Sequence, residues 1–230
     1  MNATARRRFA ADQMRFPLLK DPAPTAGAFV RGDSNRRAAE VLDAWPDGPE
    51  HILALVGPVG SGKSHLAGLW AERTAAVGFS GAEVARADMP DLEGRPILLD
   101  DADQADDATL FHLMNLAQAP GGALLLVSRE PPSVWSTALP DLRSRLDSIR
   151  TVAVEAPDDA VLAAMLEARF AERGIRPAKD VIPYLLRRID RSAAAAAEVV
   201  ARLDAMHRPV TRALAREVVE GAEESGELFE

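Results

Sequence analysis

The sequence predicts an α/β fold, a parallel sheet flanked by helices, followed by a small all-helical domain. Short apolar runs of the length of buried strands alternate with segments of helical spacing up to about residue 156. After Pro157 only helical patterns follow. With 230 residues, 47% of them hydrophobic, the chain is long enough to bury a core in both parts.

The first part alternates strands and helices in regular order. Asp33, Ser34 and Asn35 are candidate caps for its first helix. The predicted strands are 51–56, 97–99, 123–127 and 149–154, and the predicted helices are 36–44, 63–76 and 107–119.

The second part reads as a series of helices. Asp158 or Asp159 is expected to cap a helix that continues to Arg173, and Gly174 can end it. Further helices are predicted at 179–189, 192–206 and 211–220. We therefore expect a flexible arm at 1–24, an α/β domain at 25–156, and a small helical domain with an acidic tail at 157–230.

Composition excludes several classes of protein. The formal net charge of −8 excludes a basic nucleic-acid-binding surface over the whole chain, although a local basic patch stays open. The absence of cysteine excludes disulfides, thiolate metal sites and cysteine nucleophiles. No apolar run approaches the roughly 20 residues of a membrane span, and the N-terminus lacks the apolar centre of a secretory signal. We expect a cytoplasmic protein without a membrane partner.

Residues 57–64 match the phosphate-loop pattern G-x-x-x-x-G-K-[ST]. Gly57, Gly60 and Gly62 allow the backbone to curl so that its N–H groups face phosphate oxygens. Lys63 supplies a cation for the β- and γ-phosphates, and Ser64 supplies a hydroxyl for Mg²⁺. The predicted cofactor-binding residues of this loop also include Val59 and Ser61. The plain alternative is a glycine-rich turn with an incidental lysine.

A second polar element supports the phosphate site. Asp100 and Asp101 follow an apolar strand, and the carboxyl ends of parallel strands face the ligand crevice. Asp100 is expected to hold Mg²⁺ through water, and Asp101 to orient or activate the attacking water. Ser128 follows another strand and is a candidate sensor of the γ-phosphate. The alternatives are a solvated acidic loop for the aspartates and a strand-end cap for Ser128.

In combination, these motifs resemble those of the AAA+ ATPases, and in particular the replication initiator DnaA. The segment 29–36 (FVRGDSNR) resembles F-x-x-G-x-S-N, which implies that Phe29 and Val30 line the adenine of ADP or ATP. The segment 57–65 (GPVGSGKSH) resembles G-x-x-G-x-G-K-T-H and adds His65 to the cofactor-binding residues. The segment 142–146 (LRSRL) resembles the L-x-S-R-[FL] motif, which implies that Arg145 is an arginine finger. The alternative for Arg145 is a structural role, in which it forms an interdomain salt bridge.

The chain resembles the Hda family, the short DnaA-homologous regulators, because we expect no basic recognition helix after the lid helices and the sequence ends in an acidic tail. That resemblance implies binding to the DNA polymerase III sliding clamp (β subunit) and stimulation of hydrolysis of DnaA-bound ATP, which prevents over-initiation. The arm sequence QMRFPLL resembles the clamp-binding peptide Q-x-x-[LF]-x-L, with Gln13, Phe16, Pro17 and Leu18 as contacts. An apolar arm that packs on its own domain is the alternative.

One departure from the family concerns the sensor arginine of the lid. The position that aligns with this arginine is Ala194. Arg191 is close in the sequence and either replaces the missing arginine or is a surface charge. We therefore expect weak intrinsic hydrolysis and a nucleotide-dependent regulator. Because no basic recognition helix is expected, we also expect no sequence-specific DNA binding. Whether the protein forms a homo-oligomer stays open. The alternatives are a stand-alone AAA+ ATPase or helicase loader, and a P-loop kinase of small molecules.

Overall fold

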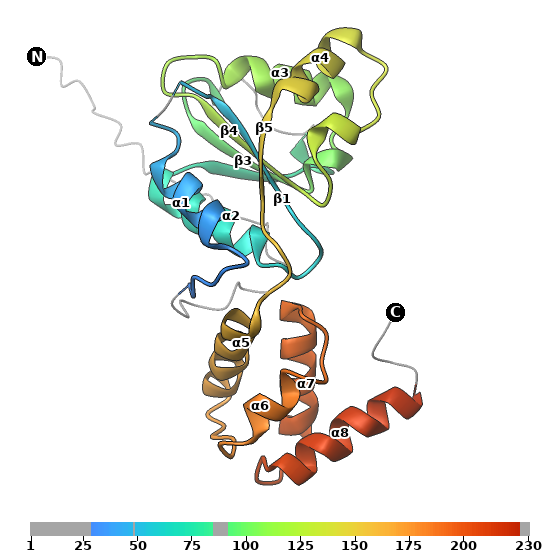
Figure 1. Ribbon diagram of the computed structural model, residues 1–230. Coiled ribbons are helices and arrows are strands. Elements are labelled where there is room, and N and C mark those ends of the chain that lie inside the picture. The colour runs from blue at the N-terminus through green and yellow to red at the C-terminus, as the bar shows by residue number, and fades with distance from the viewer. Residues whose placement is uncertain (1–28, 48, 85–91, 226–230) are drawn as a thin grey trace, which may run out of the picture.

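The computed structural model describes residues 29–47, 49–84 and 92–225. An α/β domain and a helical domain follow one another along the chain, and the segment between β5 and α5 joins them (Figure 1). Among the described residues, no helix is both long and apolar enough to cross a membrane.

The α/β domain contains a sheet of five parallel strands in the order β2-β3-β4-β1-β5. Val56, the last residue of β1, pairs with Ser128, the last residue of β4. Because every strand runs in the same direction, the residues that follow the strands meet at one edge of the sheet. The strands are β1 (Ile52–Val56), β2 (Val77–Ser80), β3 (Pro96–Asp100), β4 (Ala123–Ser128) and β5 (Arg150–Ala153).

Helices cover both faces of this sheet (Figure 1). On one face, α1 and α2 bury a cluster in which the indole rings of Trp45 and Trp70 stack with centroids 5.0 Å apart. On the other face, α3 and α4 bury a second cluster that includes Met114 and Leu142. The helices are α1 (Arg36–Ala44), α2 (Lys63–Thr74), α3 (Asp107–Leu116) and α4 (Pro140–Ser148), with short 3-10 turns η3 (Ala102–Gln104) and η4 (Pro132–Val134).

The helical domain has a core of its own. Its hydrophobic cluster begins at Leu162, whereas the clusters of the sheet end at Val154. The carboxylate of Asp158 caps the first helix by accepting the N–H of Val161 at 3.0 Å, and Gly174 ends that region at φ +66°. The helices are α5 (Asp159–Glu172), α6 (Val181–Leu185), α7 (Ala193–Ala205) and α8 (Arg212–Ser225).

Three features differ from the sequence prediction. Helix α4, which contains residues 144–146, was not predicted, because only Leu142 and Leu146 of this short polar helix are buried and its amphipathic signal is weak. Strand β2 was not predicted because its residues, VGFS, are all half-buried and include a glycine. Helix α6 is shorter than 179–189, because tighter i→i+3 turns follow Leu185.

Candidate nucleotide-binding site

The phosphate loop connects β1 to α2 at the carboxyl edge of the sheet. Gly60 and Gly62 have φ values of +75° and +91°, which L side chains rarely adopt. A side chain at Gly57 would lie 2.2 Å from the carbonyl oxygen of Val154, so the loop packs directly against the end of β5. The sequence prediction of a curled glycine loop between a strand and a helix therefore matches the local geometry.

Lys63 lies on the first turn of α2 and its side chain is buried. Its Nζ donates to the carbonyl oxygen of Pro58 at 3.1 Å, within the loop itself. Burial lowers the pKa of Lys63, and the negative charges of Asp100 and Asp101 oppose this shift. The lysine and the two aspartates, 37 and 38 positions apart in the sequence, thus act on one another electrostatically.

Ser64 and Asp100 meet at the same edge. Burial raises the pKa of the Asp100 carboxyl, while a hydrogen bond with the Ser64 side chain and another from the N–H of Asp101 act in the opposite direction. A hydroxyl and a carboxylate are the oxygen ligands that Mg²⁺ takes when nucleotide phosphates complete its shell. Within the described ranges no group of three or more histidines and acids could hold a metal alone. The donor set therefore fits Mg²⁺ brought with a nucleotide.

Asp101 and Ser128 differ in what their side chains can do. Asp101 is exposed, and its backbone is left-handed (φ +47°, ψ +47°). Ser128 is 1% exposed, and its hydroxyl donates to the carbonyl oxygen of Glu130 at 2.7 Å. That bond is the one expected of a strand-end cap, the alternative interpretation of Ser128. The role of Asp101 with water stays a prediction.

The segment predicted to line the adenine lies beside α2. The ring of Phe29 stacks on that of His65, with centroids 5.9 Å apart and planes 21° apart. Val30 is 37% exposed, and Val59 of the phosphate loop is also exposed. Burial lowers the pKa of His65. Phe29, Val30 and His65 therefore come from two separate segments, and Phe29 and His65 are in direct contact.

The same segment also binds the helical domain. Besides capping α5, the carboxylate of Asp158 accepts the N–H of Ser34 at 3.0 Å. A side chain at Gly32 would lie 2.3 Å from that carboxylate and 2.5 Å from Val161. In this structure the glycine and serine of the F-x-x-G-x-S-N motif thus serve the domain junction. The sequence offered Asp158 or Asp159 as the cap; the structure selects Asp158 and adds Ser34 as a partner that was not foreseen.

The helical domain reaches the phosphate loop through the start of α7. The N–H of Ala193 donates to the carbonyl oxygen of Gly60 at 3.1 Å, and a side chain at Gly60 would lie 2.6 Å from Cβ of Ser192. Arg191 instead contacts the carbonyl oxygen of Pro157 and the carboxylate of Asp159. Both contacts of Arg191 lie at the domain junction. Ser61, also in the loop, has a buried hydroxyl without a hydrogen-bond partner among the described residues.

Arg145 lies at the opposite edge of the sheet. With Asn115 it lines a pocket of about 400 Å³ that is otherwise formed by the segments leading into β1 and β5 and by α3 and α4. Its guanidinium lies 4.4 Å from the ring centroid of Phe111 and donates to Oδ1 of Asn115 at 2.6 Å. Since β1 has five residues, about 16 Å of strand separates this edge from the phosphate loop. No described carboxylate forms an ion pair with Arg145. The alternative prediction, that Arg145 forms an interdomain salt bridge, is therefore wrong.

Arg143 has a structural role. Its guanidinium donates to the carbonyl oxygens of Trp135 and Pro132 and pairs with Asp147 at 3.3 Å. The predicted clamp contacts Gln13, Phe16, Pro17 and Leu18 lie outside the described residues. Asn115 and Phe111 are the residues of the Arg145 site that sequence reasoning missed, and their i,i+4 spacing on α3 is the only signal that could have paired them.

Comparisons with known proteins support the architecture. No protein-family model matches the chain. The chain is 26% identical, over 86% of its length, to the chromosomal replication initiator protein DnaA of Thermomicrobium roseum, of which it spans half the length. AMPPCP-bound DnaA from Aquifex aeolicus aligns with a TM-score of 0.68 at 19% identity, covering 86% of this chain and 68% of that one.

Two further solved structures agree. A replication initiator DnaA bound to AMPPCP and single-stranded DNA aligns with a TM-score of 0.64 at 20% identity, covering 86% of this chain and 66% of that one. Domain III of Thermotoga maritima DnaA aligns with a TM-score of 0.67 at 17% identity, covering 84% of this chain and 94% of that domain. The chain is therefore homologous to the DnaA replication initiators over most of its length and has the fold of their AAA+ domain.

Proposed function

We propose that this protein is a regulator of replication initiation: it binds an adenine nucleotide with Mg²⁺, attaches to the sliding clamp, and stimulates hydrolysis of ATP bound to DnaA. The observation that carries the proposal is the place of Arg145. Its guanidinium lies at the sheet edge opposite the phosphate loop of its own chain and has no carboxylate partner among the described residues. The homology to DnaA supports a partner of the same architecture.

The chain's own site has the parts needed to bind a nucleotide. The loop backbone between Gly57 and Ser64 and the N-terminus of α2 present N–H groups to an anion. Ser64 and Asp100 would hold Mg²⁺, which neutralises charge on the phosphates. Lys63 adds a cation beside them. Structures of AMPPCP-bound DnaA have the same fold, which supports adenine as the base.

We expect slow turnover at this site, because Ala194 stands where the related family has its sensor arginine. In the free protein the hydroxyl of Ser128 bonds within its own turn, and Arg191 bonds at the domain junction. Asp101 is the one carboxylate of the strand end that is exposed to water. In this proposal the bound nucleotide has mainly a structural role, at the loop that the helical domain contacts.

Arg145 acts on a neighbour in this proposal. An arginine in trans stabilises the negative charge that develops on the γ-phosphate during hydrolysis, and the planar fork of the guanidinium suits that oxygen cluster. Phe111 and Asn115 hold the guanidinium at the surface of α3 and limit the side-chain entropy lost on binding. A folded AAA+ module that presents such an arginine to a neighbour stimulates hydrolysis without hydrolysing rapidly itself.

Two other functions remain as alternatives, a stand-alone ATPase or helicase loader and a P-loop kinase. Phosphate release is measured for the protein alone, with DNA-loaded clamp, and with clamp and ATP-loaded DnaA. The proposal predicts negligible release in the first two mixtures and rapid release in the third. Rapid release by the protein alone would favour the stand-alone ATPase, and phosphate transfer to a small acceptor would favour the kinase.

A further inference from the structure

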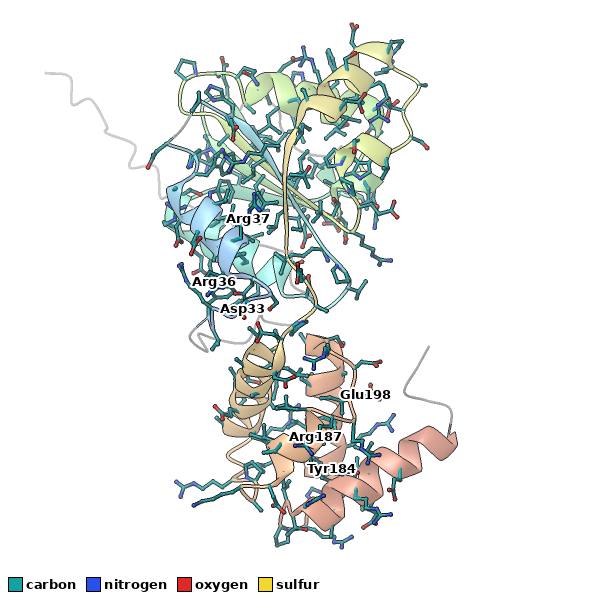
Figure 2. The ribbon with its side chains drawn as sticks, viewed as in Figure 1. Asp33, Arg36, Arg37, Tyr184, Arg187 and Glu198 are labelled. Carbon is teal, nitrogen blue, oxygen red and sulfur yellow. The ribbon has the colours of Figure 1, made fainter. Side chains whose placement is uncertain are left out.

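A cluster of cations lies on the helical domain around Tyr184. Lys179, Arg187, Arg188 and Arg212 line a pocket of about 430 Å³ together with Asp180, Pro183 and Tyr184. Figure 2 shows Tyr184 and Arg187 together in this domain, with Arg36 and Arg37 in the other. We call the four cations and Tyr184 the lid patch. It is a concentration of positive charge on a chain whose net charge is −8.

Among the described residues, the cations of the lid patch form no ion pairs. On and beside α8, Arg208 pairs with Glu217 and Arg216 pairs with Glu220, at 3.2 Å and 2.8 Å. Arg212 lies between these two arginines in the sequence, yet neither it nor the other three patch cations forms an ion pair within the part of the chain described. Asp180 lines the same pocket without joining any of them. Four cations are thus left available to an external anion.

Tyr184 organises two of these cations and contributes a donor. The guanidinium groups of Arg188 and Arg212 lie 5.7 Å and 5.6 Å from its ring centroid, within the range of cation–π attraction. Its hydroxyl is buried and has no hydrogen-bond partner among the described residues. A buried hydroxyl without a partner is unfavourable. An oxygen atom of a ligand seated in the pocket would satisfy it.

The position of Arg212 adds to the positive potential. It is the first residue of α8, and the first turn of that helix contains no acidic residue. Helix N-termini carry partial positive charge and normally attract acids, so an arginine there is electrostatically unfavourable in the free protein. A bound anion would offset both the helix dipole and the guanidinium.

We propose that the lid patch binds the phosphate backbone of DNA without reading its sequence. Arginine forks match phosphate oxygens, and duplex DNA presents a charge about every 1.7 Å along its axis, so that each of several cations meets a phosphate. The inference rests on the proposed function, in which the protein works on clamp-loaded DNA.

The test uses the full chain alone, with neither clamp nor initiator, and a short fluorescent duplex. Affinity is measured by anisotropy as NaCl rises from about 50 to 200 mM. Wild type should bind weakly with a log–log salt slope of about −3 to −4, and Arg187→Ala/Arg188→Ala should lower the slope's magnitude by about 2 and weaken binding at least tenfold. Tyr184→Phe, which keeps the ring, should weaken binding a few-fold. A duplex of scrambled sequence should bind equally.

Arg36→Ala/Arg37→Ala on α1 is the matched control, since it removes the same charge from the other domain and should leave DNA binding unchanged. Equal losses in both double variants, or no binding by wild type at low salt, would overturn the proposal. Binding of a polyglutamate peptide in place of DNA would overturn it in favour of a protein partner. Stimulation of DnaA-bound ATP hydrolysis is assayed separately without this duplex, so failure of one proposal is distinguishable from failure of the other.

Discussion

The backbone N–H of Ala193, at the start of α7, donates a 3.1 Å hydrogen bond to the carbonyl oxygen of Gly60 in the phosphate loop. The first N–H groups of a helix have no partner within the helix, so this bond satisfies a group that would otherwise need water. The helical domain is thereby joined to the loop that would carry the phosphates, and movement of one affects the other.

Gly60→Ala should separate the helical domain from the phosphate loop. The added methyl would lie 2.6 Å from Cβ of Ser192, and φ at this position is +75°. We expect the amide of Ala193 to exchange with solvent faster and nucleotide affinity to fall. Hydrogen exchange followed by mass spectrometry measures the first effect, and calorimetry the second.

Gly121→Ala is the control for backbone strain. Gly121 has φ +82° and lies in the α/β domain, where an added Cβ would meet only the backbone of Gly94. This variant should lose stability but keep slow exchange at Ala193. Equal acceleration at Ala193 in both variants would show that global destabilisation, not the lost contact, is the cause.

Asp158→Ala should weaken the domain junction. The carboxylate caps α5 and also holds the N–H of Ser34, which is 7% exposed. A lost cap costs about 1–2 kcal/mol, and the unsatisfied N–H adds to it. Asp106→Ala removes a cap of α3 with no interdomain contact, so thermal unfolding should be affected in both variants but nucleotide affinity only in Asp158→Ala.

The contribution of Asp158 to stability should depend on pH. Burial opposes its ionisation, but hydrogen bonds from the N–H groups of Ser34 and Val161 outweigh this, and the pKa of Asp158 in the folded protein is lowered. The contribution is therefore full above the unfolded pKa of about 3.9 and is lost as the pH falls through the folded value. The stability difference between wild type and Asp158→Asn should shrink on acidification below pH ~4. A constant difference would contradict this.

Lys63→Ala should weaken binding of ATP and ADP at least tenfold, on the order of 1.4 kcal/mol. The Nζ of Lys63 is held at the loop by the carbonyl oxygen of Pro58 and is the cation nearest the expected phosphates. Lys179→Ala removes the same charge from the lid patch and should leave nucleotide affinity unchanged. Equal calorimetric affinities for wild type and Lys63→Ala would reject the site.

The clamp contact is tested on the arm. Gln13→Ala/Phe16→Ala should abolish co-elution with the sliding clamp, because one buried aromatic residue can dominate a small interface. Arg8→Ala/Phe9→Ala changes the arm outside the motif and should co-elute normally. Circular dichroism checks that both variants stay folded. Retained co-elution of the first variant would show that the arm does not bind the clamp.

The sequence predicted most of the fold because its elements carry strong patterns. The four predicted strands lie within one or two residues of β1, β3, β4 and β5. Strands β1, β3 and β4 are buried apolar runs, whereas β5 buries only Val152. Strand β2 and helix α4 were missed because neither buries a regular stripe. The phosphate-loop and strand-end residues followed from local patterns, whereas Phe29, Val30, His65 and Arg145 were singled out through the resemblance to DnaA.

The contacts of the site residues could not be predicted in the same way. The hydrogen bond between Asp158 and Ser34 joins residues 124 positions apart in the sequence. The contacts of Arg145 with Asn115 and Phe111 depend on how α3 and α4 pack on the sheet. Local patterns carry no information about such pairings. The sequence offered Ser34 only as a candidate helix cap and gave no role to Gly32, whereas in the fold both contact Asp158 of the helical domain.

The most direct test of the account is hydrolysis of DnaA-bound ATP in the presence of DNA-loaded clamp, with Arg145→Ala. The variant should bind nucleotide and clamp as wild type does, yet lose most of the stimulation, because an arginine supplied in trans contributes about 10³-fold or more. Arg145→Lys should restore little, and Arg176→Ala, which removes an exposed arginine of the helical domain, should stimulate normally. Full stimulation by Arg145→Ala would contradict the account.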